Sequence, residues 1–376
     1  MDKIKVGVIG AGFIGQAQIE ALRRLGFVEV IALAESNKEV ARQRAQKLYI
    51  DKYYDDYMEL IENEDIQVIH NCTPNNMHFA INRAAIQAGK HIFSEKPLAT
   101  KFEEAFALYE LTKEYCVANA VNFNYRQYPL VKEMRERVSK GDIGDVYLVH
   151  GHYLQDWLLY DTDYDWRIQK DYGGSSRAIA DIGSHWCDTV ETIIGSRITR
   201  VFADLATIIE YRKKPDGTGG TLINYRVDTE DYGAVMVRFA NGARGVFYVS
   251  QVSAGRKNRL SFEIDGSKAS MCWDQENPNV LWIGHRDAPN EMLMRDPKLM
   301  SDKARSIVKL PGGHGDGWHD ALANNIEQFY KIIIEGRKME KDVHEFATFE
   351  QGAHIMAVVD AILRSANSGS WEDVKF

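Results

Sequence analysis

Residues 4–15 of this 376-residue chain read IKVGVIGAGFIG. The first six form a short apolar run with β-branched character, and the last six match the pattern G-x-G-x-x-G. Beyond Gly15 the spacing becomes helical, because Ile19, Leu22 and Leu25 recur three residues apart. A strand that leads through such glycines into a helix is typical of the first turn of a dinucleotide-binding βαβ unit.

Each glycine of this pattern has a physical task. Gly10 permits the tight turn, Gly12 lets the backbone approach a pyrophosphate, and Gly15 allows close packing of helix on strand. The helix that starts among these residues offers free N–H groups and a partial positive charge to phosphates. The alternative is a purely structural glycine turn.

Glu35 lies 20 residues beyond Gly15, at the end of the next apolar run, residues 28–34. A carboxylate at this place accepts hydrogen bonds from the adenosine ribose hydroxyls and repels a 2′-phosphate. The sequence therefore predicts NAD rather than NADP, a preference that Ser36 and Lys38 would soften. A solvated charge at a strand end is the alternative for Glu35.

The first third of the chain continues the alternation of strands and helices, to about Asn122. Apolar runs at 68–72 and 91–94 alternate with helical segments at 37–48 and 78–88. This order indicates βαβ units and a parallel sheet.

Beyond about Asn122 the pattern of apolar residues changes. Helical spacing at 131–139 and a long strand at 146–154 are followed by alternating segments between residues 201 and 282. Asn241-Gly242 and Asp265-Gly266 each separate two alternating runs, which predicts hairpins and an antiparallel sheet in a second domain. Two helices, 318–335 and 349–365, close the chain. An exposed loop is predicted at 213–217.

The composition excludes several classes of protein. Lys and Arg number 46 against 54 Asp and Glu, a net charge of −8 with no basic block, so no surface for nucleic acid or anionic membrane is predicted. No apolar run approaches the roughly 18 residues that span a bilayer. Four cysteines without a CxxC pair indicate reduced thiols, and therefore a cytoplasmic protein.

Two further clusters carry chemical groups. Glu95-Lys96-Pro97 follows a buried strand at its C-terminal end, where open α/β sheets place their ligands; a surface ion pair is the alternative. Asp181 and His185 lie four residues apart and share one helix face, so that the carboxylate orients the imidazole as a general base requires. The alternatives are an N-cap for Asp181, a core histidine for His185, and a zinc site that includes Cys187.

These three pieces, in this order, resemble the Gfo/Idh/MocA family of sugar and polyol dehydrogenases over nearly the whole chain. The resemblance implies an α/β fold with a Rossmann domain over residues 1–123. It places a substrate-binding and oligomerisation domain, with a large and mostly antiparallel sheet, over residues 124–376. It also implies homodimers or homotetramers that form through the open face of that sheet.

The family's catalytic roles carry over to three positions. Lys96 would hydrogen-bond the reacting oxygen and stabilise negative charge on it. His185 would remove the hydroxyl proton, and Asp181 would orient His185 or hold a neighbouring substrate hydroxyl. No metal is implied.

The resemblance also implies two sets of binding residues. The NAD set is Gly10, Gly12, Phe13, Ile14, Gly15, Glu35, Thr73, Pro74, Asn75, His78, Glu95, Lys96, Asn124, Trp166 and Arg167. The substrate set is Lys96, Tyr125, Tyr153, Gln155, Trp157, Asp181, His185 and His314. In it, Trp157 would offer a sugar ring an apolar face and Gln155 would read a hydroxyl. For such residues the alternative is a packing aromatic or a loop position.

The function that these observations predict is oxidation of a secondary hydroxyl of a cyclic sugar, anhydrosugar or inositol to a ketone, with NAD as hydride acceptor. One alternative is a non-catalytic sensor of nucleotide or sugar on the same fold. A sensor has no need of an acid–base pair, which Lys96, Asp181 and His185 supply. The second alternative is a zinc-dependent dehydrogenase.

Overall fold

The computed structural model describes residues 3–216, 220–339 and 344–376. The chain divides into two compact units, residues 1–127 with 318–356 and residues 128–317 with 357–376. The first unit thus extends a little beyond residue 123 and takes in a segment from late in the chain.

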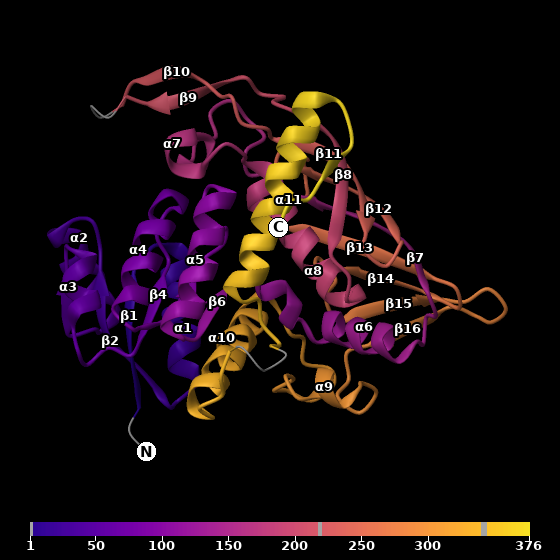
Figure 1. Cartoon of the computed structure of the whole chain (residues 1–376), viewed down its shortest axis with the longest axis horizontal. Helices are drawn as coiled ribbons and strands as arrows, with labels where there is room; N and C mark the ends of the chain where they lie inside the picture. The colour runs from indigo at the N-terminus through magenta and orange to yellow at the C-terminus, as the bar shows by residue number, and fades with distance from the viewer. Residues whose placement is uncertain (1–2, 217–219, 340–343) are drawn as a thin grey trace. The chain divides into compact units, whose positions relative to one another are not determined.

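The first unit contains a six-stranded parallel sheet in the order β3-β2-β1-β4-β5-β6. Its strands are β1 (Ile4–Ile9), β2 (Val28–Ala34), β3 (Lys52–Tyr54), β4 (Val68–Asn71), β5 (His91–Ser94) and β6 (Asn119–Val121). Successive strands are connected by α1 (Phe13–Arg24), α2 (Lys38–Leu48), α3 (Tyr57–Glu62), α4 (Asn75–Gln87) and α5 (Phe102–Tyr115) (Figure 1). The predicted parallel sheet is confirmed, and its order reverses beside β1, where such folds bind their ligands.

Helix α10 (Trp318–Ile334) completes this unit by packing against α1. Ile19 and Leu22 of α1 belong to the same buried cluster as Leu322 and Phe329 of α10. Burial of each such side chain is worth roughly 1.5–3 kcal/mol. The late segment is therefore part of the core that supports the glycine turn.

The second unit is built on a nine-stranded sheet in the order β16-β15-β14-β13-β7-β12-β11-β8-β17. The strands are β7 (Val146–Leu154), β8 (Ile198–Ala206), β11 (Tyr232–Phe239), β12 (Arg244–Ser250), β13 (Arg259–Gly266), β14 (Ser270–Asp274), β15 (Val280–Gly284), β16 (Glu291–Met294) and β17 (Glu372–Asp373). All neighbours are antiparallel except β7 and β12. The predicted, mostly antiparallel sheet is confirmed.

Helical segments accompany this sheet. They are α6 (Pro129–Lys140), η2 (Trp166–Ile168), α7 (Lys170–Gly173), the π-helical turn η3 (Ile179–Gly183), α8 (Ser184–Ile194) and α9 (Asp302–Arg305). The last helix, α11 (Phe349–Ser368), contributes its first turns to the first unit and the rest to the second. Helices α6 and α8 pack against each other.

One of the two predicted hairpin turns is confirmed and the other lies further along the chain. Gly242 has φ +91° in the turn between β11 and β12, where an L side chain would be strained. Gly266 is instead the last residue of β13, and the turn follows it at 267–269. A Cβ on Gly266 would lie 2.1 Å from the carbonyl oxygen of Ile143, so this glycine is required by close packing.

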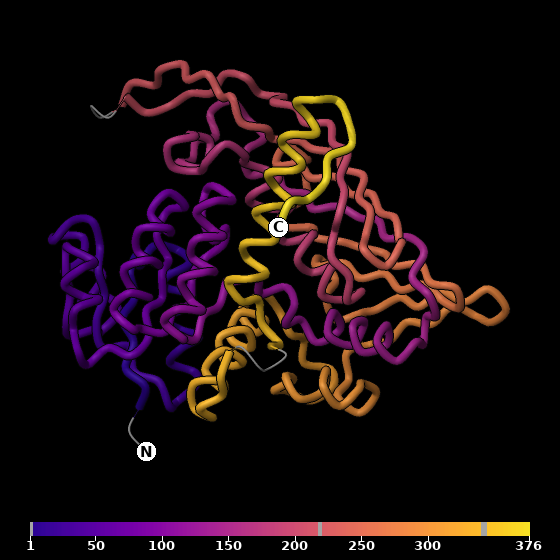
Figure 2. The backbone as a smooth tube through the Cα atoms, viewed as in Figure 1, coloured from indigo at the N-terminus to yellow at the C-terminus, as the bar shows by residue number. Residues whose placement is uncertain are grey.

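The loop predicted at 213–217 is wrong for residues 213–215. These belong to β9 (Tyr211–Pro215), which pairs with β10 (Leu222–Arg226) in a separate two-stranded sheet. Residue 217 lies outside the described residues. In Figure 2 this hairpin extends from the rest of its unit as an arm.

None of the helices in the described parts of the chain is both long enough and apolar enough to cross a membrane.

Candidate active site

The glycine turn has the geometry that a pyrophosphate needs. Gly10 has φ +85°, and a Cβ on Gly15 would lie only 2.0 Å from the carbonyl oxygen of Gly10. A Cβ on Gly12 would meet no atom within 4 Å, so the space in front of this residue is open. Because α1 begins at Phe13, its unpaired N–H groups, Ile14 among the first, face the start of the helix. The turn therefore fits a dinucleotide.

Glu35 follows β2 and is tied to the same turn. Its Oε1 accepts a hydrogen bond of 2.6 Å from the N–H of Ala11, and it forms an ion pair with Arg44 of α2. Only 11% of the Glu35 side chain is exposed, so the carboxylate is held in one place at the end of the strand. Arg44, nine residues from Glu35 on the helix that follows, was not among the residues predicted from the sequence.

The loop after β4 is organised by side chains from its own unit. The Thr73 hydroxyl donates to Oδ1 of Asn71 at 2.7 Å, and Pro74 is the residue before α4, which begins at Asn75. His78 is fully buried, with Nε2 2.9 Å from the carbonyl oxygen of Thr73 and Nδ1 2.6 Å from that of Pro97. Its ring therefore holds the loops after β4 and β5 together.

Lys96 stands at the carboxyl end of β5, next to a buried carboxylate. Glu95 is 6% exposed and accepts 2.6 Å hydrogen bonds from the amides of Gln18 and Asn122. Burial raises the pKa of Glu95, while these hydrogen bonds and the nearby Lys96 oppose that effect. The alternative of a surface ion pair is therefore wrong. The Lys96–Pro97 peptide bond is cis.

Asn124 and Tyr125 lie in the short helix η1 (Asn124–Gln127), and both side chains are buried. Nδ2 of Asn124 has no hydrogen-bond partner within the described residues. A buried amide that lacks an acceptor is what a bound polar ligand would satisfy.

In the second unit, Asp181 and His185 lie where the π-helical turn η3 passes into α8. Asp181 does not cap this helix. Its Oδ2 accepts a 2.9 Å hydrogen bond from Gln251, and Nε of Arg167 is 3.9 Å from its Oδ1. π-Helical turns are frequent at functional sites. His185 is 6% exposed, and its ring centre is 6.2 Å from that of Tyr153.

Three of the predicted substrate residues form a hydrogen-bonded row beside His185. The Tyr153 hydroxyl donates to Oδ1 of Asn258 at 2.6 Å, and Nε2 of Gln155 donates to the same oxygen at 2.9 Å. Nε1 of Trp157 donates to Oε1 of Gln155 at 2.8 Å. Asn258, which centres this row, was missed because it lies about 100 residues away on a loop without a motif.

The remaining predicted residues occupy two different settings. The guanidinium of Arg167 lies 4.3 Å from the centre of the Trp166 ring and pairs with Asp165 at 3.1 Å. His314 is exposed on the loop before α10. That loop is held near its end by Asp316, whose carboxylate is 3.0 Å from Nε of Arg295.

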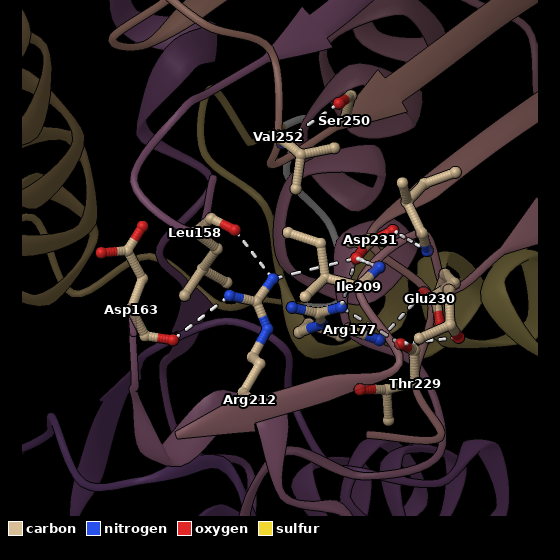
Figure 3. Close-up of polar contacts among 12 residues, drawn as sticks. Leu158, Asp163, Arg177, Ile209, Arg212, Thr229, Glu230, Asp231, Ser250 and Val252 are labelled. Atoms are coloured by element: carbon tan, nitrogen blue, oxygen red, sulfur yellow. Dashed lines mark hydrogen bonds and ion pairs between the residues drawn. The ribbon is translucent and has the colours of Figure 1, made fainter. Parts of the chain in front are cut away.

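Two buried arginines support the segments that carry the site in this unit (Figure 3). Arg212, from β9, donates to the carbonyl oxygens of Leu158 at 2.7 Å and of Tyr160 at 2.8 Å, directly after Trp157. Arg177 and Arg212 both face Asp231, at 3.4 Å and 3.8 Å. Burial lowers the pKa of both guanidinium groups, and the Asp231 charge opposes that shift.

Two family models match this sequence. The model "Oxidoreductase family, NAD-binding Rossmann fold" matches residues 4–123, and "GFO/IDH/MocA C-terminal domain" matches residues 131–272. The chain belongs to the Gfo/Idh/MocA family. It is an NAD-dependent oxidoreductase of that family, and the predicted class of enzyme and cofactor are confirmed.

Several relatives within the Gfo/Idh/MocA family are similar along much of the chain. Levoglucosan dehydrogenase of Pseudarthrobacter phenanthrenivorans is 32% identical, covering 100% of this chain and 99% of the relative. Myo-inositol 2-dehydrogenase of Thermotoga maritima is 28% identical, covering 72% and 75%. The structure of levoglucosan dehydrogenase in complex with NADH and L-sorbose has a TM-score of 0.91 at 31% identity, with both chains fully covered.

Proposed function

We propose that this protein oxidises a secondary hydroxyl group of a cyclic sugar, anhydrosugar or inositol to a ketone. The observation that carries the proposal is the row of Trp157, Gln155, Asn258 and Tyr153, which ends beside the ring of His185. An aromatic face with amide and phenol groups suits a ring that bears several hydroxyls, and the imidazole is next to it. The full-length similarity to levoglucosan dehydrogenase supports the same class of substrate.

Each proposed catalytic residue has one task. His185 takes the proton from the reacting hydroxyl, and Asp181, held by Gln251, orients His185 or a neighbouring substrate hydroxyl. Nζ of Lys96 donates to the reacting oxygen and stabilises the negative charge that develops on it. NAD, when bound, supplies the acceptor for the hydride that leaves the carbon bearing the reacting hydroxyl. The products are a ketone, NADH and one proton.

Outside the catalytic residues, we assign the open face of the nine-stranded sheet to self-association, as a homodimer or homotetramer. Leu148, Met236, Val246 and Tyr248 lie on three adjacent strands of this face and are each 42–50% exposed. A cluster of exposed apolar side chains is typical of a protein–protein interface. Light scattering after gel filtration tests this, and a monomer that persists at high concentration would contradict it.

The decisive experiment measures NAD reduction by absorbance with a panel of inositols, aldoses and anhydrosugars. Lys96→Ala and His185→Ala should each lower kcat about 10²–10⁴-fold while NAD still binds. Lys101→Ala, at an exposed position, is the matched control for Lys96→Ala and should retain activity. Binding of NAD without turnover of any substrate would favour the sensor, and full activity of either site variant would refute the catalytic assignment.

A further inference from the structure

A chain of buried polar side chains crosses the first unit and ends at Glu95, the neighbour of Lys96. The Tyr330 hydroxyl is 3.0 Å from Nε2 of His70, and Nδ1 of His70 is 2.6 Å from Oε1 of Gln18. Nε2 of Gln18 donates to Oε1 of Glu95 at 2.6 Å. Tyr330, His70 and Gln18, which lead to Glu95 in this series of hydrogen bonds, have no exposed surface. They come from α10, β4 and α1, and short-range sequence patterns gave no sign of them.

The donors and acceptors of this chain all run in one direction. Oε1 of Gln18 only accepts, so the His70 ring carries its proton on Nδ1, and Nε2 accepts from the Tyr330 hydroxyl. Burial lowers the pKa of His70 to about 3, which keeps the ring neutral, and raises the pKa of Tyr330 well above its usual value. Every hydrogen bond therefore points towards Glu95.

The surroundings of Glu95 make it dependent on these donors. Its Oε1 accepts from two neutral amides, of Gln18 and Asn122, and the backbone N–H of Lys96 is 3.3 Å from its Oε2. Titratable groups that interact electrostatically with it include Lys96 on its own segment and the buried Cys72 thiol after β4. Burial raises the pKa of this carboxylate, and the hydrogen bonds from Asn122, Gln18 and the Lys96 backbone, together with the charge of Lys96, oppose that effect and hold the carboxylate in place.

We propose that Tyr330, His70 and Gln18 are positioning residues for Lys96, which act through the carboxylate of Glu95. Tyr330 and His70 fix Gln18 so that its amide holds the carboxylate of Glu95 in place, and Glu95 in turn fixes the backbone and the electrostatic environment of Lys96. The inference rests on the proposed role of Lys96. It requires that loss of a donor to Glu95 make Glu95 easier to protonate, so that activity is lost at higher pH than in the wild type.

The test compares pH profiles of kcat and KM for the wild type, Gln18→Met and Tyr330→Phe. Gln18→Met keeps the length of the side chain and removes the donor, so the acidic limb of the kcat profile should move up by about one pH unit. Tyr330→Phe keeps the ring, and with it the ring stacking on His70, and should cause a smaller shift in the same direction. KM for NAD should stay within about twofold, because these variants do not remove binding energy that is common to the ground state and the transition state.

Tyr54→Phe is the matched control, because it removes a hydroxyl that contacts Asn63 in the same unit but not this chain. It should leave the profile unchanged. Profiles of Gln18→Met and Tyr330→Phe that are lowered equally at every pH would show a merely structural role and overturn the proposal. So would a shift of the same size in the control.

A second readout separates this inference from the proposed function. The carboxyl ¹³C signal of Glu95, assigned with Glu95→Gln, should titrate at higher pH in Gln18→Met than in the wild type whether or not a substrate is known. An unchanged titration overturns the positioning role. Activity that survives in Lys96→Ala refutes the proposed function instead, while the titration of Glu95 still reports on the hydrogen bonds.

Discussion

Gly12 and Gly15 are separated by two residues, and the structure predicts different consequences for the stability of the protein when each is replaced by alanine. A Cβ on Gly15 would lie 2.0 Å from the backbone oxygen of Gly10, where no flexible side chain can move aside. Helix α1 must then shift from β1, and overpacking of this kind costs about 1–3 kcal/mol. In a unit of this size each kcal/mol lowers Tm by about 2–4 °C.

Gly12→Ala should leave the free protein almost unchanged. Gly12 has φ −69°, which alanine adopts without strain, and its Cβ would meet no atom within 4 Å. The new methyl group enters only the open space that the pyrophosphate is expected to use. We expect Tm within about 2 °C of the wild type, with NAD affinity at least tenfold lower, about 1.4 kcal/mol.

Thermal melts and calorimetric titration with NAD measure both quantities. Gly15→Ala should lose stability and affinity together, whereas Gly12→Ala should lose affinity alone. Adenosine, which lacks phosphates, should bind to Gly12→Ala and to the wild type with equal affinity. Wild-type affinity of Gly12→Ala for NAD would refute the placement of the pyrophosphate, and an unchanged Tm of Gly15→Ala would refute the packing argument.

Three further predictions concern Glu35, Arg212 and His70. Glu35→Ser should leave Arg44 without its carboxylate partner and able to face a 2′-phosphate, so the ratio of kcat/KM for NADP to that for NAD should rise at least tenfold; an unchanged ratio would contradict the ribose assignment. Arg212→Met should lower stability by about 3–5 kcal/mol in urea unfolding, because Asp231 and the carbonyl groups after Trp157 lose a buried cation, while the Kd for NAD stays constant. His70 is neutral when folded, with a pKa of about 3, but has a pKa near 6.5 when unfolded, so its stabilising effect is complete above pH 6.5 and declines as the pH falls towards 3. Unfolding free energies at pH 7 and 5 should differ by about 2 kcal/mol more in the wild type than in His70→Gln, and equal differences would show that His70 does not titrate in this way.

The parts of the fold and of the candidate site that could be predicted from the sequence are those whose cause is local. The glycine turn, Glu35 at the end of β2 and the Asn241-Gly242 hairpin each depend on residues within one supersecondary unit, so their spacing carries the information. Lys96 was predicted in the same way, from its place after a buried strand, and the structure places it just beyond the end of β5.

The parts that sequence reasoning missed depend on distant partners. Asp231 faces two arginines that lie 54 and 19 residues before it in the sequence. Asn258 accepts hydrogen bonds from side chains about 100 residues earlier. Nothing in the local sequence marks either residue, since a charged or amide side chain in a polar segment is usually solvated. Only the fold brings these groups together, and the short-range patterns of a single sequence do not show which of them will meet.

Glu35 and Glu95 show how far residue type alone falls short. Both follow parallel strands in the first unit, and both were predicted to contact the cofactor. Glu35 is paired with the cation Arg44 and with a backbone N–H at the start of the glycine turn, so its carboxylate is placed where a ribose is expected. Glu95 is buried, and its Oε1 accepts hydrogen bonds from the neutral amides of Gln18 and Asn122, so this oxygen is already occupied within the unit. We therefore expect Glu95 to support Lys96, and its replacement should change kcat more than the affinity for NAD.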